Sequence, residues 1–189
     1  TLAGFPKARY YRRKSFWSES PMVYLATVKY EGNHEEWMPL YESWNYESGD
    51  KVLVRLFTNQ PEAELFLNGK SLGRKAAGEG AGFMAAFETA YEPGELKAVS
   101  YVDGEISGTH ILETAAEEVS LCVEADRRSL KADGADLSFL TVSLRDKDGR
   151  ENLQAVKEVT VQVEGAGTLQ GFGSADPQAL GSYQDTTWK

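Results

Sequence analysis

The chain has 189 residues, of which 41% are hydrophobic, and its formal net charge is −9. This length is enough to form one large or two small hydrophobic cores. An acidic balance argues against a nucleic-acid partner, because phosphate binding needs a concentrated basic surface. No apolar run approaches the roughly 18 residues that a transmembrane helix needs, so no membrane partner is expected.

The charge is unevenly distributed along the chain. Residues 1–20 carry a net charge of +4, whereas residues 21–112 carry −7 and residues 113–189 carry −6. We expect the basic opening segment to dock on an acidic surface of its own protein.

The opening segment also contains the one helix that the pattern predicts, over residues 7–17. Pro6 suits the first turn, and Pro21 disfavours helical geometry just before it. Tyr10 and Trp17 are seven residues apart and share a face, with Tyr11 beside them. A helix of this length is marginal in water, so we expect Trp17 to pack on the module of residues 21–112 or on another chain.

Residues 21–112 read as a β-sandwich module. Residues 22–28 form a plausible strand, and period-2 patterning ended by turn residues predicts further strands from residue 51 to 112. Asn68-Gly69 is a strong signal for a hairpin turn. Further turns are expected at residues 92–95 and 103–104.

A second β unit follows a short polar linker at residues 113–118. Apolar runs at residues 119–125, 137–145 and 156–163 alternate with Asp-Gly turns, which is typical of a second sandwich. The predicted fold is therefore all-β, with two consecutive Ig-like β-sandwich domains at residues 21–112 and 119–189 after a short N-terminal helix at residues 1–20.

No catalytic constellation is visible. His34 and His110 have no nucleophile motif nearby and are expected at the surface or at a strand edge. Asp146 and Asp148 lack a full calcium-loop frame, so a hairpin turn is expected there. Cys122, the only cysteine, is expected to be a small strand residue. We predict no catalytic residue, no metal site and no cofactor.

Aromatic residues offer one candidate binding face. Sugars stack on aromatic rings, and Trp37, Trp44 and Tyr46 make the best cluster for such a contact. The alternative is that these rings fill the core or pack between domains, because aromatic side chains mostly supply buried area.

The same residues carry a resemblance to a known family. Residues 63–73 (AELFLNGKSLG) and 91–99 (YEPGELKAV) resemble the Ig-like domain that follows the catalytic barrel in bacterial glycoside hydrolase family 2 enzymes, chiefly β-galactosidases. Residues 2–7, with Tyr10, Tyr11 and Trp17, resemble the end of that barrel, and residues 117–189 resemble the domain after it. Where the family usually has H-W-N-W, this chain has Ser43-Trp44-Asn45-Tyr46, and where it has G-x-G-N-G-D-P, this chain has residues 171–177 (GFGSADP).

The resemblance implies a parent enzyme that is a retaining β-glycosidase, whose two catalytic glutamates lie outside this sequence. It places Phe5 and Lys7 near the barrel mouth and makes the catalytic barrel the main partner. It also implies that the last sandwich lacks its closing strand, so that a dimer could form through an exposed edge strand or through the N-terminal helix. The compartment, secreted, periplasmic or cytoplasmic, stays open.

Three functions compete on the sequence. The first is a non-catalytic brace for the barrel. The second is a carbohydrate-binding module, which requires exposed tryptophan or tyrosine rings. The third is an Ig-like scaffold for protein interaction or adhesion, which requires a large exposed apolar patch.

Overall fold

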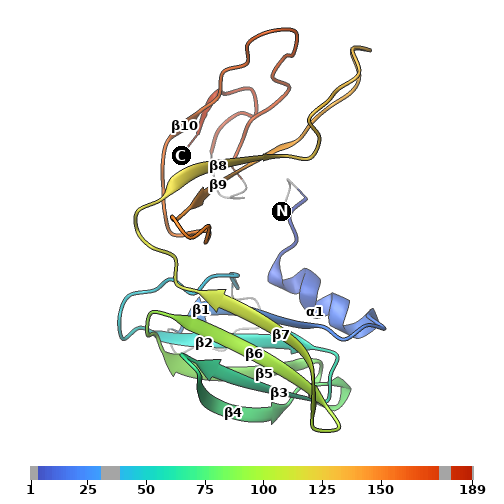
Figure 1. Ribbon diagram of the computed structural model, residues 1–189, viewed down its shortest axis with the longest axis vertical. Helices are drawn as coiled ribbons and strands as arrows, with labels where there is room; N and C mark the ends of the chain where they lie inside the picture. Colours follow the sequence, from blue (N-terminus) through green and yellow to red (C-terminus); the bar gives the residue numbers. More distant parts are fainter. Residues whose placement is uncertain (1–3, 31–38, 175–179, 189) are drawn as a thin grey trace.

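The computed structural model describes residues 4–30, 39–174 and 180–188. Strands β1–β7 form a sandwich, and strands β8–β11 belong to a smaller part beyond it. Figure 1 shows helix α1 beside the sandwich and the smaller part reached by the chain after β7. The all-β prediction with one short helix is confirmed. No helix among the described residues is long and apolar enough to cross a membrane.

The sandwich consists of two antiparallel sheets. One has the order β1-β2-β5, formed by β1 (Val23–Lys29), β2 (Lys51–Thr58) and β5 (Met84–Ala90). The other has the order β4-β3-β6-β7, formed by β4 (Lys70–Ala76), β3 (Glu62–Leu67), β6 (Glu95–Val102) and β7 (Glu105–Glu113). A short 3₁₀ turn, η1 (Glu79–Ala81), precedes β5. The core between the sheets is built from alternate positions of the strands, including Leu25, Val54, Leu56, Leu65 and Leu96.

Strands β1 and β2 are buried on both faces. Val52, Val54 and Leu56 point into the core, while Leu53 and Phe57 on the other face of β2 are buried as well. An antiparallel sheet with one wet face shows a clear apolar and polar alternation. The run VLVRLF lacks that alternation because helix α1 (Ala8–Trp17) and neighbouring side chains cover the second face.

The helix packs through a different face from the one that the sequence predicted. Ala8 and Ser15 are buried and Tyr11 is half-buried, whereas Tyr10 is exposed and Trp17 is 73% exposed. Trp17 therefore does not pack on the sandwich, and the alternative that it packs on another chain stays a prediction. The spacing of seven residues was right, but small residues at positions 8 and 15 let the helix backbone lie close to Ala26 and Phe57.

The two motifs that carried the family resemblance interlock in space. Asn68 and Gly69 have φ angles of 49° and 79°, which confirms the hairpin turn between β3 and β4. The Asn68 side chain donates to the Pro93 carbonyl (3.1 Å) and accepts from the Glu95 N–H (2.9 Å). A β-carbon at Gly94 would collide with the Asn68 side chain, so the turn requires glycine there.

The part beyond the sandwich contains two antiparallel ribbons. One is β8 (Ser120–Ala125) with β9 (Leu140–Arg145), and the other is β10 (Val159–Thr160) with β11 (Thr187–Trp188). The strand predicted at residues 119–125 is confirmed, with Cys122 on it and free. The strand that was expected over residues 156–163 is much shorter, because only Val159 and Thr160 find a partner.

Ala115 and Ala116 join the sandwich to the ribbons. A side chain of the sandwich bonds Ala115, and side chains from the part beyond the sandwich bond Ala116. Asn45 accepts from the Ala115 N–H (3.1 Å) and donates to its carbonyl (2.8 Å). Asp146 accepts from the Ala116 N–H (3.0 Å), and Asn152 donates to the Ala116 carbonyl (2.9 Å). The backbone N–H and carbonyl groups of Ala115 and Ala116 are therefore all satisfied by side chains from the parts that these residues connect.

Asp146 at this joint makes a turn, as predicted, and is not arranged as a calcium ligand. Its carboxylate accepts from the N–H groups of Ala116, Asp148 and Arg150. These hydrogen bonds, with the one from Ala116 strongest, hold the pKa of Asp146 below its ordinary value.

This geometry predicts an acid-sensitive joint. A carboxylate with a lowered pKa in the folded protein stabilises it above the ordinary aspartate pKa of about 4, and the contribution is lost as the pH falls through the lowered value. We expect Asp146→Ala to speed hydrogen exchange at the Ala116 amide at neutral pH, with amides of the core strand β3 unchanged. The matched control is Asp148→Ala, which removes a nearby exposed carboxylate that does not bond Ala116. Equal exchange in both variants would contradict the prediction.

Candidate functional site

Two of the three aromatic residues predicted to contact sugar, Trp44 and Tyr46, lie in the described part of the chain. Trp44 is fully buried in the sandwich core, and its indole N–H donates to the Glu92 carbonyl (3.1 Å). Tyr46 is half-buried beside it, with its hydroxyl bonded to Thr27 (2.7 Å), and Trp37 lies outside the described residues. The structure gives Trp44 the alternative role, core packing, since a fully buried ring offers no face to a sugar.

Phe5 and Lys7 lie at the start of helix α1. Lys7 is the residue that precedes the first helical turn, and both side chains are exposed. Their position near the barrel mouth of a parent enzyme stays a prediction.

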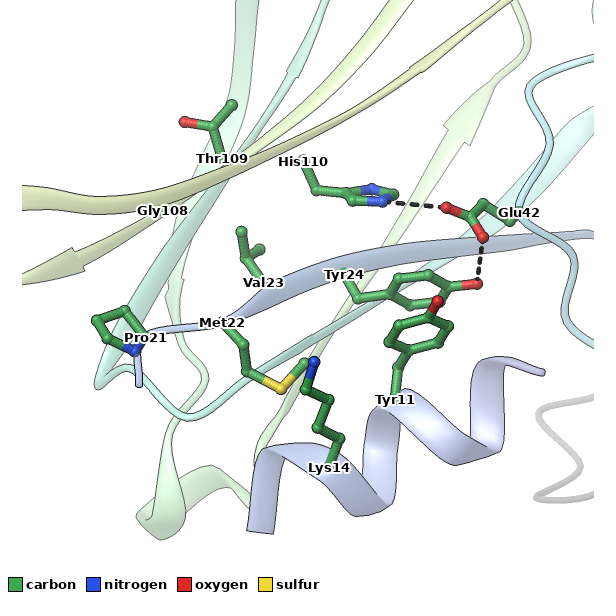
Figure 2. Close-up of a pocket in the computed structure, with 10 residues that line it drawn as sticks. All are labelled: Tyr11, Lys14, Pro21, Met22, Val23, Tyr24, Glu42, Gly108, Thr109 and His110. Carbon is green, nitrogen blue, oxygen red and sulfur yellow. Dashed lines mark hydrogen bonds and ion pairs between the residues drawn. The ribbon is translucent and has the colours of Figure 1, made fainter. Parts of the chain in front are cut away.

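A pocket lies where helix α1, strand β1 and strand β7 meet. Its volume is about 270 Å³, and Figure 2 shows ten residues around it. Tyr11 and Lys14 come from α1, Tyr24 from β1, Glu42 from the segment between β1 and β2, and His110 from β7. Four separate pieces of the chain therefore build one concave surface.

A chain of contacts links the polar residues of this pocket. The Tyr24 hydroxyl donates to Glu42 Oε2 (3.0 Å), and Glu42 Oε1 lies 3.2 Å from His110 Nε2. His110 Nδ1 accepts the backbone N–H of Leu25 (3.3 Å). Since Nδ1 is an acceptor, the proton of a neutral imidazole lies on Nε2 and is donated to Glu42.

The Tyr24 ring extends this chain to the helix. It stacks on the Tyr11 ring with a centroid separation of 3.7 Å and an interplanar angle of 11°. In Figure 2 both tyrosine hydroxyls point towards Glu42. The pocket thus connects helix α1 to β1 and β7, which are edge strands of the two sheets. We call this cluster of Tyr11, Tyr24, Glu42 and His110 the seam.

The electrostatics of the seam keep the tyrosines protonated. Burial raises the pKa of Tyr24 above its ordinary value, and the charge and hydrogen bond of Glu42 raise it further. Burial and the Glu42 charge also raise the pKa of Tyr11. Tyr24 is therefore suited to be a hydrogen-bond donor and not a base.

This arrangement can bind polar groups, but the described residues around it do not include the pair of carboxylates that a glycosidase site needs. Hydrolysis of a glycosidic bond needs two carboxylates on either side of it, and Glu42 is the one carboxylate among the residues that line the pocket. The described residues also contain no group of three side chains arranged to hold a metal ion.

Sequence reasoning missed this cluster. His110 was expected at a surface or strand edge, and it does lie on the edge strand β7, but its role as a bridge to β1 was not foreseen. His34, the other histidine, lies outside the described residues. A weak signal was available only at Tyr24, a residue with a polar hydroxyl in the otherwise apolar run of residues 22–26.

Comparisons with known proteins find similarity to glycoside hydrolase family 2 proteins. Residues 49–107 match a domain of unknown function, DUF4982, and residues 121–189 match the glycoside hydrolase family 2 C-terminal domain 5. The beta-galactosidase BoGH2A of Bacteroides ovatus is 30% identical over 185 residues, and a beta-glucuronidase of Formosa agariphila is 26% identical over 178 residues. A solved structure of a glycosyl hydrolase family 2 member from Bacteroides cellulosilyticus is 32% identical, with a TM-score of 0.92 over 99% of this chain.

These relatives are much longer than the chain. The match covers 97% of this chain but 20% of the Bacteroides ovatus protein, and 92% of this chain but 16% of the Formosa agariphila protein. In the Bacteroides cellulosilyticus structure the matched region is 26% of the chain. The likeness therefore concerns one region of larger enzymes.

The seam predicts a measurable contribution from the Tyr24 hydroxyl. Tyr24→Phe keeps the stacked ring but removes the donor to Glu42, so we expect the free energy of unfolding to fall by about 1 kcal/mol. The matched control is Tyr10→Phe, which removes the hydroxyl of an exposed tyrosine of helix α1 and should leave the free energy of unfolding unchanged.

The stability of Tyr24→Phe should also depend less on pH in alkaline solution than that of the wild type. A tyrosine whose pKa is raised on folding stabilises the protein below the ordinary value of about 10, and this stability is lost as the pH rises further. Urea unfolding above that pH should show a steeper loss in the wild type than in Tyr24→Phe. Parallel curves would contradict the raised pKa of Tyr24.

Proposed function

The chain belongs to glycoside hydrolase family 2 and corresponds to its C-terminal region, and from this premise we propose that it braces the catalytic barrel of a longer enzyme without contributing catalytic residues. That enzyme is a β-glycosidase of β-galactosidase type in this proposal. The division into a helix at residues 1–20, a sandwich at 21–112, a linker at 113–118 and a second domain at 119–189 belongs to the same proposal.

The observation that carries the bracing role is the two-faced helix α1. One face is fixed to the sandwich by buried Ala8 and Ser15 and by the stack of Tyr11 on Tyr24. The other face presents exposed Tyr10 and Trp17. Large exposed aromatic side chains on an otherwise anchored helix are typical of a surface that packs on a further partner.

The charge of the helix supports the same role. Residues 4–20 contain five basic side chains and one acidic side chain, whereas the rest of the chain is acidic. A basic, aromatic helix held against an acidic sandwich presents a distinct patch to whatever precedes the sandwich. Aromatic and arginine side chains are the residue types enriched at such contacts.

The bracing role is tested in an enzyme in which residues 1–189 follow the catalytic domain. Trp17→Ala should lower the stability of the catalytic domain by about 2 kcal/mol or more, as for a central interface residue, while the hydrolysis rate at low temperature stays near the wild-type value. The matched control is Tyr41→Ala, which removes a half-exposed aromatic residue that is not part of the helix. Equal thermal inactivation of wild type and Trp17→Ala would overturn the proposal.

A second candidate function, sugar binding, is favoured by the pocket at the seam. Tyr11, Glu42 and His110 bring an aromatic ring, a carboxylate and an imidazole to one concave surface large enough for a small ligand. These are groups that recognise hydroxyl-rich molecules. The site differs from the one that the sequence suggested, since Trp44 is in the core.

Titration of residues 1–189 with galactose, lactose and β-linked galactan fragments tests this candidate by calorimetry and NMR shifts. Binding that is lost in Glu42→Gln and kept in Glu47→Gln, which changes an exposed turn residue, would support a sugar site at the seam. Absence of shifts at high sugar concentration would leave the bracing role alone. The same samples should hydrolyse no chromogenic β-galactoside.

A further inference from the structure

Strands β1 and β7 are edge strands of different sheets, and a side chain joins them. An edge strand has backbone N–H groups that no neighbouring strand of its own sheet accepts. On β1, Thr27 uses its outward N–H and carbonyl to bond the backbone of Tyr41 (2.8 and 2.9 Å). Two residues earlier, the N–H of Leu25 is donated to Nδ1 of His110 on β7 (3.3 Å). The imidazole therefore links the two sheets at their edges.

The N–H that His110 accepts is a buried one. Leu25 is 0% exposed, and its partner in the ladder on the other side of β1 is Leu56 of β2. A buried N–H that loses its acceptor destabilises the folded state, because it has given up its hydrogen bonds to water. A change that removes the lone pair of Nδ1 therefore weakens the contact between β1 and β7.

A second proton on the imidazole is such a change. Nε2 lies 3.2 Å from Glu42 Oε1 and carries the proton of the neutral ring, so a further proton goes to Nδ1. The new Nδ1–H then faces the N–H of Leu25, and two donors cannot bond each other. The charged ring is at the same time attracted more strongly to the Glu42 carboxylate. Acid therefore breaks the bond of His110 to β1 and strengthens its bond to Glu42.

The surroundings of the ring leave histidine as the group that responds to mild acid. The described residues of the pocket that can carry charge, besides His110, are Tyr11 and Lys14 of α1, Tyr24 of β1 and Glu42 of the segment before β2. The cross-strand neighbour of His110 on β6 is Ala98, which carries no charge. Burial raises the pKa of both tyrosines, so they stay neutral in acid. Histidine is the side-chain type whose charge changes between about pH 5 and 8.

We propose that His110 is a pH-sensitive switch, whose neutral imidazole holds β1 against β7 and whose protonated form releases β1. The side chain is 23% exposed, so protons reach it from solvent. The strand that it releases also carries the helix, because Tyr24 of β1 stacks on Tyr11 of α1. Mild acid therefore loosens the place where helix α1 is attached. The proposal depends neither on the bracing role nor on sugar binding.

Hydrogen exchange of residues 1–189, followed by NMR at about pH 8 and about pH 5.5, tests the proposal. Each rate is divided by that of an unstructured amide at the same pH. We expect the protection of the Leu25 amide to fall by about tenfold in acid, as its buried N–H loses its acceptor. The amide of Leu65, on the inner strand β3, should keep its protection. Nitrogen chemical shifts of the imidazole report whether the ring has taken up its second proton.

The matched variant is His110→Asn, whose side-chain oxygen can take the place of Nδ1 and accept the same N–H without titrating. In this variant the Leu25 amide should be equally protected at both pH values. Glu42→Gln keeps the histidine but removes the carboxylate that attracts the charged ring, so the loss of protection should move to lower pH.

Three results would overturn the proposal. The first is a Leu25 amide that stays fully protected although the imidazole is charged, since the ring would then not control β1. The second is a ring that remains neutral at the acid pH. The third is an equal loss of protection in the wild type and in His110→Asn, which would assign the acid response to another group.

Discussion

The burial of strands β1 and β2 on both faces is the constraint on which the rest of this structure depends. The inner face of these strands packs on the second sheet, and the outer face holds Tyr24, Ala26 and Phe57, which would meet water without helix α1. Each large apolar side chain removed from water contributes about 1.5–3 kcal/mol. The helix therefore packs as part of the sandwich. Because the helix covers this face, Tyr11 meets Tyr24, Glu42 and His110 in the seam.

Local patterns predicted the elements well because their causes are local. Period-2 alternation, the Asn68-Gly69 turn and the Asp103-Gly104 turn depend on the residues that form them, and both turns have the positive φ angles that such pairs allow. The prediction of a helix ending before Pro21 is likewise confirmed. These features need no knowledge of what lies across the fold.

Contacts between residues far apart in the sequence could not be predicted from local patterns. Two faces of helix α1 share the spacing of seven residues, and only the tight fit of Ala8 and Ser15 against the sheet decides between them. The seam joins residues 11, 24, 42 and 110, and its hydrogen bonds connect positions up to 85 residues apart. The burial of Trp44 follows from sheets closing over it, which composition alone does not reveal.

The joint at Ala115 and Ala116 has a mechanical consequence. The peptide group between these two residues is held by both parts, because its carbonyl accepts from Asn45 and its N–H donates to Asp146. Rotation of this peptide group breaks one hydrogen bond to each part, so the joint resists torsion. The ribbons therefore cannot turn against the sandwich at this point without losing hydrogen bonds of the chain that connects them.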